Sequence, residues 1–150
     1  MTVYYLDSSG WVKRYFLEQG SEWILSLFES HDQMASASLG YIEVAATLAR
    51  REGRRRHPSL PEGSLRNVLE AHWQKFAEAP VESSVLELAR ALAWEKRLRG
   101  ADAVHLGAAD VLRQRLAKHS VGLTLVTADV EMVVAARSID LDVINPTTIL

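Results

Sequence analysis

Four acidic residues lie where helices are expected to begin, each in a different stretch of the 150-residue chain. Asp7 and Asp129 each follow an apolar run that predicts a buried strand, and Glu43 and Asp102 fall near the starts of two predicted helices. In a parallel sheet, strand–helix junctions gather along one edge, outside the carboxyl ends of the strands. A cation between the carboxylates would offset their repulsion, and oxygen ligands of this kind suit Mg²⁺ or Mn²⁺. The pattern predicts metal-dependent chemistry on a phosphate.

A single acid at a helix start has a simpler explanation, because it can cap the helix or interact with its dipole for about 1 kcal/mol or less. The surroundings of Asp102 favour the metal. Its neighbours Ala101 and Ala103 are apolar, and an unpaired carboxylate is costly to desolvate among such residues. A bound cation removes that cost. Glu131, two residues after Asp129, is a further acid that could lie outside the metal ligands.

Histidine and tryptophan are weaker candidates for chemistry. His105 follows Asp102 by three positions and should share its helix face, yet we expect a packed, hydrogen-bonded side chain and not a ligand. The tryptophans are expected in the core or in an interface, and not as platforms for base stacking: Trp11, Trp23, Trp73 and Trp94.

Strands and helices are predicted to alternate along the chain. Short apolar runs predict strands at 2–6, 34–38, 121–127 and 141–144. Helical periodicity predicts helices from a cap at Ser8 or Ser9 through Phe16, and over 22–29, 41–53, 64–77, 85–96, 102–118 and 131–137, with a loop at 57–63. This order predicts an α/β fold, a parallel β-sheet flanked by helices in a three-layer α/β/α arrangement, as one domain over residues 1–150.

Composition excludes several classes of protein. The chain is 48% hydrophobic and 24% charged, which is ordinary for a globular domain. It has no cysteine, so disulfides, zinc–thiolate sites and thiol nucleophiles are excluded. The first residues lack the pattern of a signal peptide, and no apolar run approaches the length of a membrane span. A cytoplasmic protein without a membrane segment is expected.

Basic residues are concentrated in one short segment although the net charge is −2. Five arginines lie within seven residues and are called the arginine cluster below: Arg50, Arg51, Arg54, Arg55 and Arg56. Together with Arg99, they are candidates for sequence-independent contacts with the phosphates of a polyanion. The alternative is a solvated helix end and loop, where cations are favourable.

Four blocks of sequence, in this order, resemble the PIN-domain ribonucleases, specifically the VapC-type toxins of toxin–antitoxin pairs. The blocks are YYLDSS at 4–9, SLGYIEVA at 38–45, LRGADAVHL at 98–106 and LVTAD at 125–129. The resemblance implies that Asp7, Glu43, Asp102 and Asp129 bind Mg²⁺ or Mn²⁺, with Ser8 or Ser9 as a supporting hydroxyl. It leaves open how Asp129 and Glu131 share the last ligand role. It also implies hydrolysis of RNA phosphodiester bonds, inhibition by a cognate antitoxin, and a homodimer.

Other phosphate-handling folds fit less well. An aspartyl-phosphate phosphatase would need a second acid where Ser9 stands, and a receiver domain would need a lysine after the late strand, where 126–129 has none. Residues 7–10 are not the glycine-rich turn of a dinucleotide-binding domain. Two alternatives remain: a chromosomal RNA-processing PIN nuclease without a toxin role, and a non-catalytic PIN-like module that binds RNA or a partner.

Overall fold

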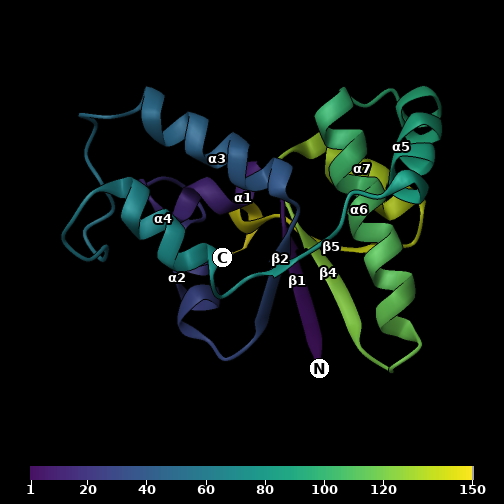
Figure 1. Cartoon of the computed structure of the whole chain (residues 1–150), viewed down its shortest axis with the longest axis horizontal. Coiled ribbons are helices and arrows are strands. Elements are labelled where there is room, and N and C mark those ends of the chain that lie inside the picture. Colours follow the sequence, from purple (N-terminus) through teal and green to yellow (C-terminus); the bar gives the residue numbers. More distant parts are fainter. Residues whose placement is uncertain (150) are drawn as a thin grey trace.

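The computed structural model describes residues 1–149, which are built around a five-stranded parallel sheet (Figure 1). The strand order is β3-β2-β1-β4-β5, so the first strand lies in the middle. The strands are β1 (Thr2–Leu6), β2 (Gln33–Ser36), β3 (Ala77–Glu78), β4 (Gly122–Val126) and β5 (Asp142–Ile144). All pairs are parallel, which confirms the predicted sheet. Leu150, the last residue of the expected domain, lies outside the described residues.

Helices cover both faces of this sheet. The α-helices are α1 (Ser8–Trp11), α2 (Ser21–Glu29), α3 (Ser38–Arg50), α4 (Leu65–Trp73), α5 (Ser83–Lys96), α6 (Gly100–Ala117) and α7 (Val130–Ser138), with 3₁₀ turns η1 (Val12–Arg14) and η2 (Pro146–Thr148). In Figure 1, α1 to α4 lie on one side of the sheet and α5 to α7 on the other. This arrangement confirms the three-layer α/β/α fold. No helix within residues 1–149 has both the length and the apolar character that crossing a bilayer requires.

Alternate residues of the central strand serve two separate cores. Val3 and Tyr5 point into the core shared with α5, α6 and α7. Leu6 is buried in the second core, formed with α1 to α4, and Tyr4 packs against its edge. Such alternation follows from the two-residue period of a strand. Both faces of β1 are covered, which explains why its sequence is apolar throughout.

Two local predictions were wrong. The first helix was expected to reach Phe16 from a serine cap, but α1 ends at Trp11, and the cap is Asp7, whose side chain accepts the Gly10 N–H. Phe16 instead forms an isolated bridge with Arg56. Further along, the helix expected over 64–77 ends at Trp73, and Ala77–Glu78 pairs with β2 as an edge strand. Tertiary pairing overrides local helical preference in both places.

Candidate active site

The carboxyl ends of β1 and β4 lie side by side and bring the first acid next to a buried threonine. Leu6 pairs with Val126 at the last position of the two strands, and the Asp7 N–H donates to the Val126 carbonyl at 3.2 Å. The residue after β1 is therefore Asp7, and the residue after β4 is Thr127; both are buried. Register alone accounts for their contact.

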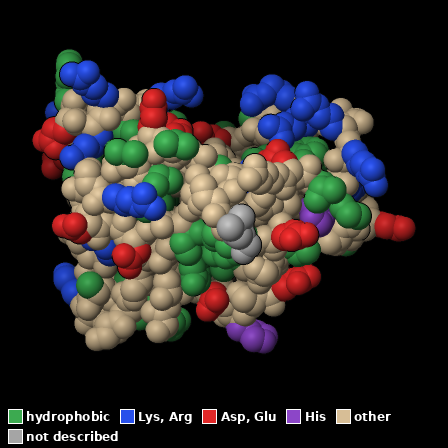
Figure 2. Space-filling model, turned by 180° about the vertical axis from the view of Figure 1, so that it is seen from behind, with side chains coloured by type: hydrophobic (Ala, Val, Ile, Leu, Met, Phe, Trp, Pro, Cys, Tyr) green, Lys and Arg blue, Asp and Glu red, His purple; other side chains and the backbone are tan. Residues whose placement is uncertain are grey.

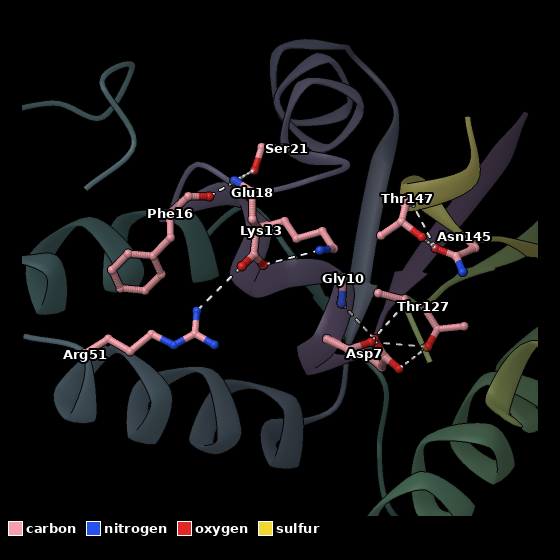
Figure 3. A network of polar contacts seen from close by, with 12 residues as sticks. Asp7, Gly10, Lys13, Phe16, Glu18, Ser21, Arg51, Thr127, Asn145 and Thr147 are labelled. Atoms are coloured by element: carbon pink, nitrogen blue, oxygen red, sulfur yellow. Dashed lines mark hydrogen bonds and ion pairs between the residues drawn. The ribbon is translucent and has the colours of Figure 1, made fainter. Parts of the chain in front are cut away.

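Hydrogen bonds hold both carboxylate oxygens of Asp7. Oδ1 accepts the Ser9 hydroxyl at 2.7 Å and the Gly10 N–H at 3.0 Å, and Oδ2 accepts the Thr127 hydroxyl at 2.5 Å. Figure 3 shows Asp7 between Gly10 and Thr127. The side chain is only 3% exposed. Burial raises the pKa of Asp7, and the bonds from Thr127, Ser9 and Gly10 oppose that rise.

Ser9, and not Ser8, contacts the first acid. Besides bonding Asp7, the Ser9 hydroxyl accepts the Ala128 N–H at 2.9 Å, so it ties the end of β1 to the turn that follows β4. Ser8 forms no side-chain hydrogen bond with any residue between 1 and 149. Of the two serines left open by the sequence, the geometry favours Ser9 as the supporting hydroxyl.

Asp129 caps the helix that follows β4. Its Oδ1 accepts the N–H groups of Glu131 at 2.9 Å and Met132 at 3.3 Å, and its own N–H donates to the Thr127 hydroxyl oxygen at 3.1 Å. Thr127 therefore fixes Asp7 and Asp129 together. Glu131 contributes its backbone to this turn, while the residue itself is exposed. This geometry favours Asp129 over Glu131 as the acid at the site.

Glu43 is held by a buried histidine. Its Oε1 lies 2.6 Å from Nε2 of His105, and Nδ1 of His105 lies 2.8 Å from the Tyr5 hydroxyl. Burial raises the pKa of Tyr5, which keeps it a protonated phenol able to donate to Nδ1. Nε2 then carries the hydrogen that is donated to Glu43. His105 is 1% exposed, as expected for a packed side chain, and it positions the carboxylate of Glu43.

A glycine lets the helix that carries Glu43 approach closely. A Cβ atom on Gly40, in the first turn of α3, would collide with the Ser36 hydroxyl and lie 3.2 Å from Cε1 of His105. Ser36 itself donates to the Leu6 carbonyl at 2.7 Å, at the end of the central strand. Gly40 thus sets the short distance between α3 and the sheet edge.

Asp102 lies in the first turn of α6 and experiences the charges of the other three acids. Burial raises its pKa most, followed by the charges of Asp129 and Asp7, while His105 lowers it and Glu43 adds a smaller rise. Thr127 brings Asp7 and Asp129 together, and Asp102 begins the helix whose His105 holds Glu43, so the four predicted acids lie toward one edge of the sheet. Among residues 1–149, no three His, Cys, Asp or Glu side chains are arranged so as to enclose a metal ion. The donor set fits a hard divalent cation in its chemistry, although it is not closed around a single point.

The arginine cluster is divided between side chains that have partners in the chain and side chains that are exposed without one among residues 1–149. Arg51 lies 3.8 Å from Glu18, and its guanidinium group lies over the ring of Phe16 (Figure 3). Glu18 also pairs with Lys13, at 3.3 Å. Arg56 donates to the carbonyls of Gly63 and Pro61. The remaining arginines of the predicted set are exposed: Arg50, Arg54, Arg55 and Arg99. Figure 2 shows Lys and Arg side chains gathered over the end of α3 and the loop after it, at the upper right.

Thr127, His105 and Tyr5 support the acids but were not predicted to do so. Thr127 stands two residues before Asp129 in a strand–turn sequence, and a hydroxyl there could have been recognised as a partner for both acids. Tyr5 and His105 are 100 residues apart, and nothing in the local sequence links them. Asp110, two turns after Asp102 on α6, pairs with Arg113.

Comparison with known proteins identifies the family to which this chain belongs. The PIN domain family model matches residues 4–137. Two curated proteins of Mycobacterium tuberculosis, Ribonuclease VapC45 (strain CDC 1551 / Oshkosh) and Ribonuclease VapC49 (strain ATCC 25618 / H37Rv), are each 39% identical over 113 residues, covering 73% of this chain and 76% of the relative. A solved structure described as FitAB bound to an IR36 DNA fragment has a TM-score of 0.58 at 19% identity, covering 100% of this chain and 98% of the other. That likeness concerns the fold alone. The chain belongs to the PIN domain family and, within it, to the VapC-type ribonucleases.

Proposed function

We propose that this chain is a divalent-metal-dependent endoribonuclease that acts as the toxin of a toxin–antitoxin pair, with its 150 residues forming one nuclease domain. The observation that carries the proposal is the convergence of the acids: Thr127 hydrogen-bonds both Asp7 and Asp129, and Asp102 begins the helix whose His105 hydrogen-bonds Glu43. Burial raises the pKa of Asp102 most, and the charges of Asp129, Asp7 and Glu43 oppose its ionisation further. A scaffold has no need for acids placed where their charges repel. A cation removes that repulsion, which makes the acids a binding site for Mg²⁺ or Mn²⁺.

In this proposal Asp7 and Asp102 would hold the ion directly, and Glu43 and Asp129 would hold it directly or through water. A divalent cation held by these carboxylates would supply a bound water of lowered pKa and would stabilise charge on the phosphate and the leaving oxygen. The protein supplies orientation. Ser9 and Thr127 fix the carboxylate of Asp7, and His105 fixes that of Glu43, so the oxygens are positioned before substrate arrives.

Contacts with the RNA backbone are assigned to exposed cations. Arg50, Arg54, Arg55 and Arg99 are exposed and form no ion pair with the residues that the structure describes. Such contacts are independent of sequence and weaken with salt. Arg51 and Arg56 have internal partners, so we expect smaller contributions from them.

Two partners are proposed from family membership. A free ribonuclease would damage its own cell, so we infer a cognate antitoxin that covers the acidic site, with a basic side chain directed toward the carboxylates. We also infer a homodimer. Gel filtration with light scattering on the isolated chain tests the dimer, and co-purification with the product of a small neighbouring open reading frame tests the antitoxin.

The central experiment is cleavage of total cellular RNA by the purified chain in Mg²⁺, in Mn²⁺ and in EDTA. Asp7→Asn and Asp102→Asn keep the size of the side chain and remove its charge. We expect each to reduce cleavage by more than the roughly 10- to 100-fold that loss of an outer-shell partner costs. Arg113→Ala, which breaks an ion pair with Asp110 away from the four acids, is the matched control and should cleave normally.

Cleavage that survives EDTA, or that survives either asparagine substitution, would refute the mechanism. The toxin role has a separate test, in which the chain is expressed with and without its neighbouring reading frame. A toxin arrests growth only when expressed alone. An active nuclease that never arrests growth would instead be the RNA-processing alternative, and a folded chain that binds RNA without cleaving it would be the non-catalytic one.

A further inference from the structure

The most exposed tryptophan of the chain lies beside the start of the helix that carries Asp102. Trp94 is 88% exposed, in the last turn of α5. The sequence predicted that Trp94 lies in the core or an interface and is not a platform for base stacking; the core assignment is wrong, and the exposure of the ring makes base stacking possible. Trp11, Trp23 and Trp73 each pack against another aromatic ring, whereas Trp94 packs against no ring within residues 1–149.

Helical geometry explains this exposure. The side of α5 that contains Val85, Ala89 and Leu92 is buried, and α6 approaches it so closely that a Cβ on Gly107 would lie 3.1 Å from the Val85 carbonyl oxygen. Trp94 stands two residues after Leu92, about 200° further around the helix. Its ring therefore points away from α6 into solvent.

Exposed arginines flank Trp94 along the chain, one turn before it and three residues after it. They are Arg90, on the same side of α5, and Arg97. Neither forms an ion pair or a side-chain hydrogen bond with the part of the chain that the structure describes. The nearest exposed large apolar residue on α5 is Leu86, two turns away. An interface core would need contiguous apolar surface, whereas one ring between arginines suits a base flanked by phosphates.

Arg97 also has an unusual backbone. It ends α5 with φ of 54°, in the left-handed region that favours glycine. A non-glycine residue in this conformation costs free energy, and such residues cluster at functional sites.

The arginines at the α5–α6 turn connect the ring to the acidic site. Gly107 of α6 packs beside Val85 and Ala89, so the two helices run antiparallel and the last turn of α5 adjoins the first turn of α6. Arg97 and Arg99 lie in the three-residue connection, and Asp102 follows in that first turn. Figure 2 shows Lys and Arg side chains also at the upper left, on the side that carries α5, with acidic side chains between them and the group over α3.

We propose that single-stranded RNA runs from the acidic site across Arg99 and Arg97 and stacks one base on Trp94, with Arg90 and Arg97 binding the flanking phosphates. The inference rests on the proposed ribonuclease function and adds the path that the RNA follows across the surface. Stacking on an aromatic ring accepts any base, so this surface selects unpaired RNA and not a particular sequence.

The test is binding of a fluorescent single-stranded oligouridylate, and of a duplex of equal length, to the full chain in EDTA, where no cleavage is expected. Trp94→Ala should raise the Kd for the single strand by about 5- to 100-fold, and Trp94→Phe by less, because a smaller ring still stacks. Leu86→Ala, on the same helix, is the matched control with unchanged Kd. Intrinsic tryptophan fluorescence should be quenched by the oligonucleotide in the wild-type chain, and Trp94→Phe should lose that quenching.

Arg97→Gly separates binding from folding. Glycine relieves the left-handed backbone, so this variant should resist urea better than the wild type while binding RNA less tightly. The slope of log Kd against log salt should fall by about 0.7, the value for one phosphate contact on a single strand. A purely structural residue would not change these two quantities in opposite directions.

Three outcomes would overturn the proposal, and they are distinguishable. If Trp94→Ala binds RNA like the wild type while the wild type still cleaves it, the strand path is wrong and the nuclease function stands. If Trp94→Ala leaves the RNA Kd unchanged but lowers the mass by light scattering, Trp94 belongs to an interface between copies of this chain. If the wild type neither binds nor cleaves RNA, the proposed function itself fails.

Discussion

Asp7 and Glu43 are held in place by different chemistry. Asp7 is almost fully buried and accepts hydrogen bonds from two hydroxyls and one backbone amide, all near the ends of β1 and β4. Glu43 is 30% exposed at its side chain and is held by one imidazole that projects from α6. The Asp7 end of the site is thus fixed by the sheet, and the Glu43 end by the packing of α3 against α6.

The largest effect that would test this contrast is expected for His105→Ala. Glu43 loses its only side-chain donor among residues 1–149, so cleavage should fall by about 10- to 100-fold. The buried hydroxyl of Tyr5 also loses its acceptor, which should lower the free energy of unfolding by roughly 1–3 kcal/mol. Both are measured on one preparation, by RNA cleavage at saturating Mn²⁺ and by urea denaturation.

His72→Ala is the matched control for that substitution. His72 on α4 accepts or donates a similar bond to the Tyr15 hydroxyl at 2.8 Å, but in the other core, and burial lowers its pKa to about 4. This variant should lose stability and keep its specific activity. Equal activity in the two variants would mean that His105 serves only the core.

A smaller effect is expected for Thr127→Val, which keeps the shape of the side chain and removes the hydroxyl. Asp7 then loses one of three donors, and the Asp129 N–H loses its acceptor. Cleavage should fall about 10-fold, at the low end for a supporting partner. Thr127→Ser should restore it, and Thr124→Val on the same strand is the control. A valine variant as active as wild type would show that Ser9 and Gly10 suffice to hold Asp7.

The smallest expected effect is a gain in stability, for the substitution Asp102→Asn. The folded state raises the pKa of Asp102 above its ordinary value of 3.8, so the native chain retains a proton that the unfolded chain has released. The free energy of unfolding therefore falls as pH rises through that window. Asp102→Asn should remove this loss and stabilise the metal-free chain at pH 7 by under about 1 kcal/mol, since the group is partly solvated. Below pH 3.8 the difference should vanish.

Urea denaturation in EDTA at pH 3.5, 5 and 7.5 measures this effect. Adding Mg²⁺ should reverse the ranking, because an ion that binds only the native state stabilises it, by about 2.7 kcal/mol at a hundred times the Kd, and Asp102→Asn weakens that binding. An asparagine variant that is less stable than wild type in EDTA would show that Asp102 is satisfied by the protein alone.

Local sequence determined the elements and the positions of the acids. Short continuous apolar runs marked β1 and β4, and Asp7 and Asp129 could be placed just after these runs because a strand that is buried on both faces ends where charged residues begin. The parallel order followed from the alternation of strands and helices. These features depend only on residues close together in the chain.

Tertiary structure decided which groups touch. The contact between Asp7 and Thr127 needs β1 and β4 to be neighbours in one register, although 120 residues separate them. The two-residue strand β3 exists only because β2 offers an unpaired edge. Trp94 is exposed because α6 covers the opposite side of α5. Apolar periodicity predicts whether a side chain is buried or exposed, but it does not predict which residues that side chain contacts. Those residues depend on strand order and on helix packing between distant segments.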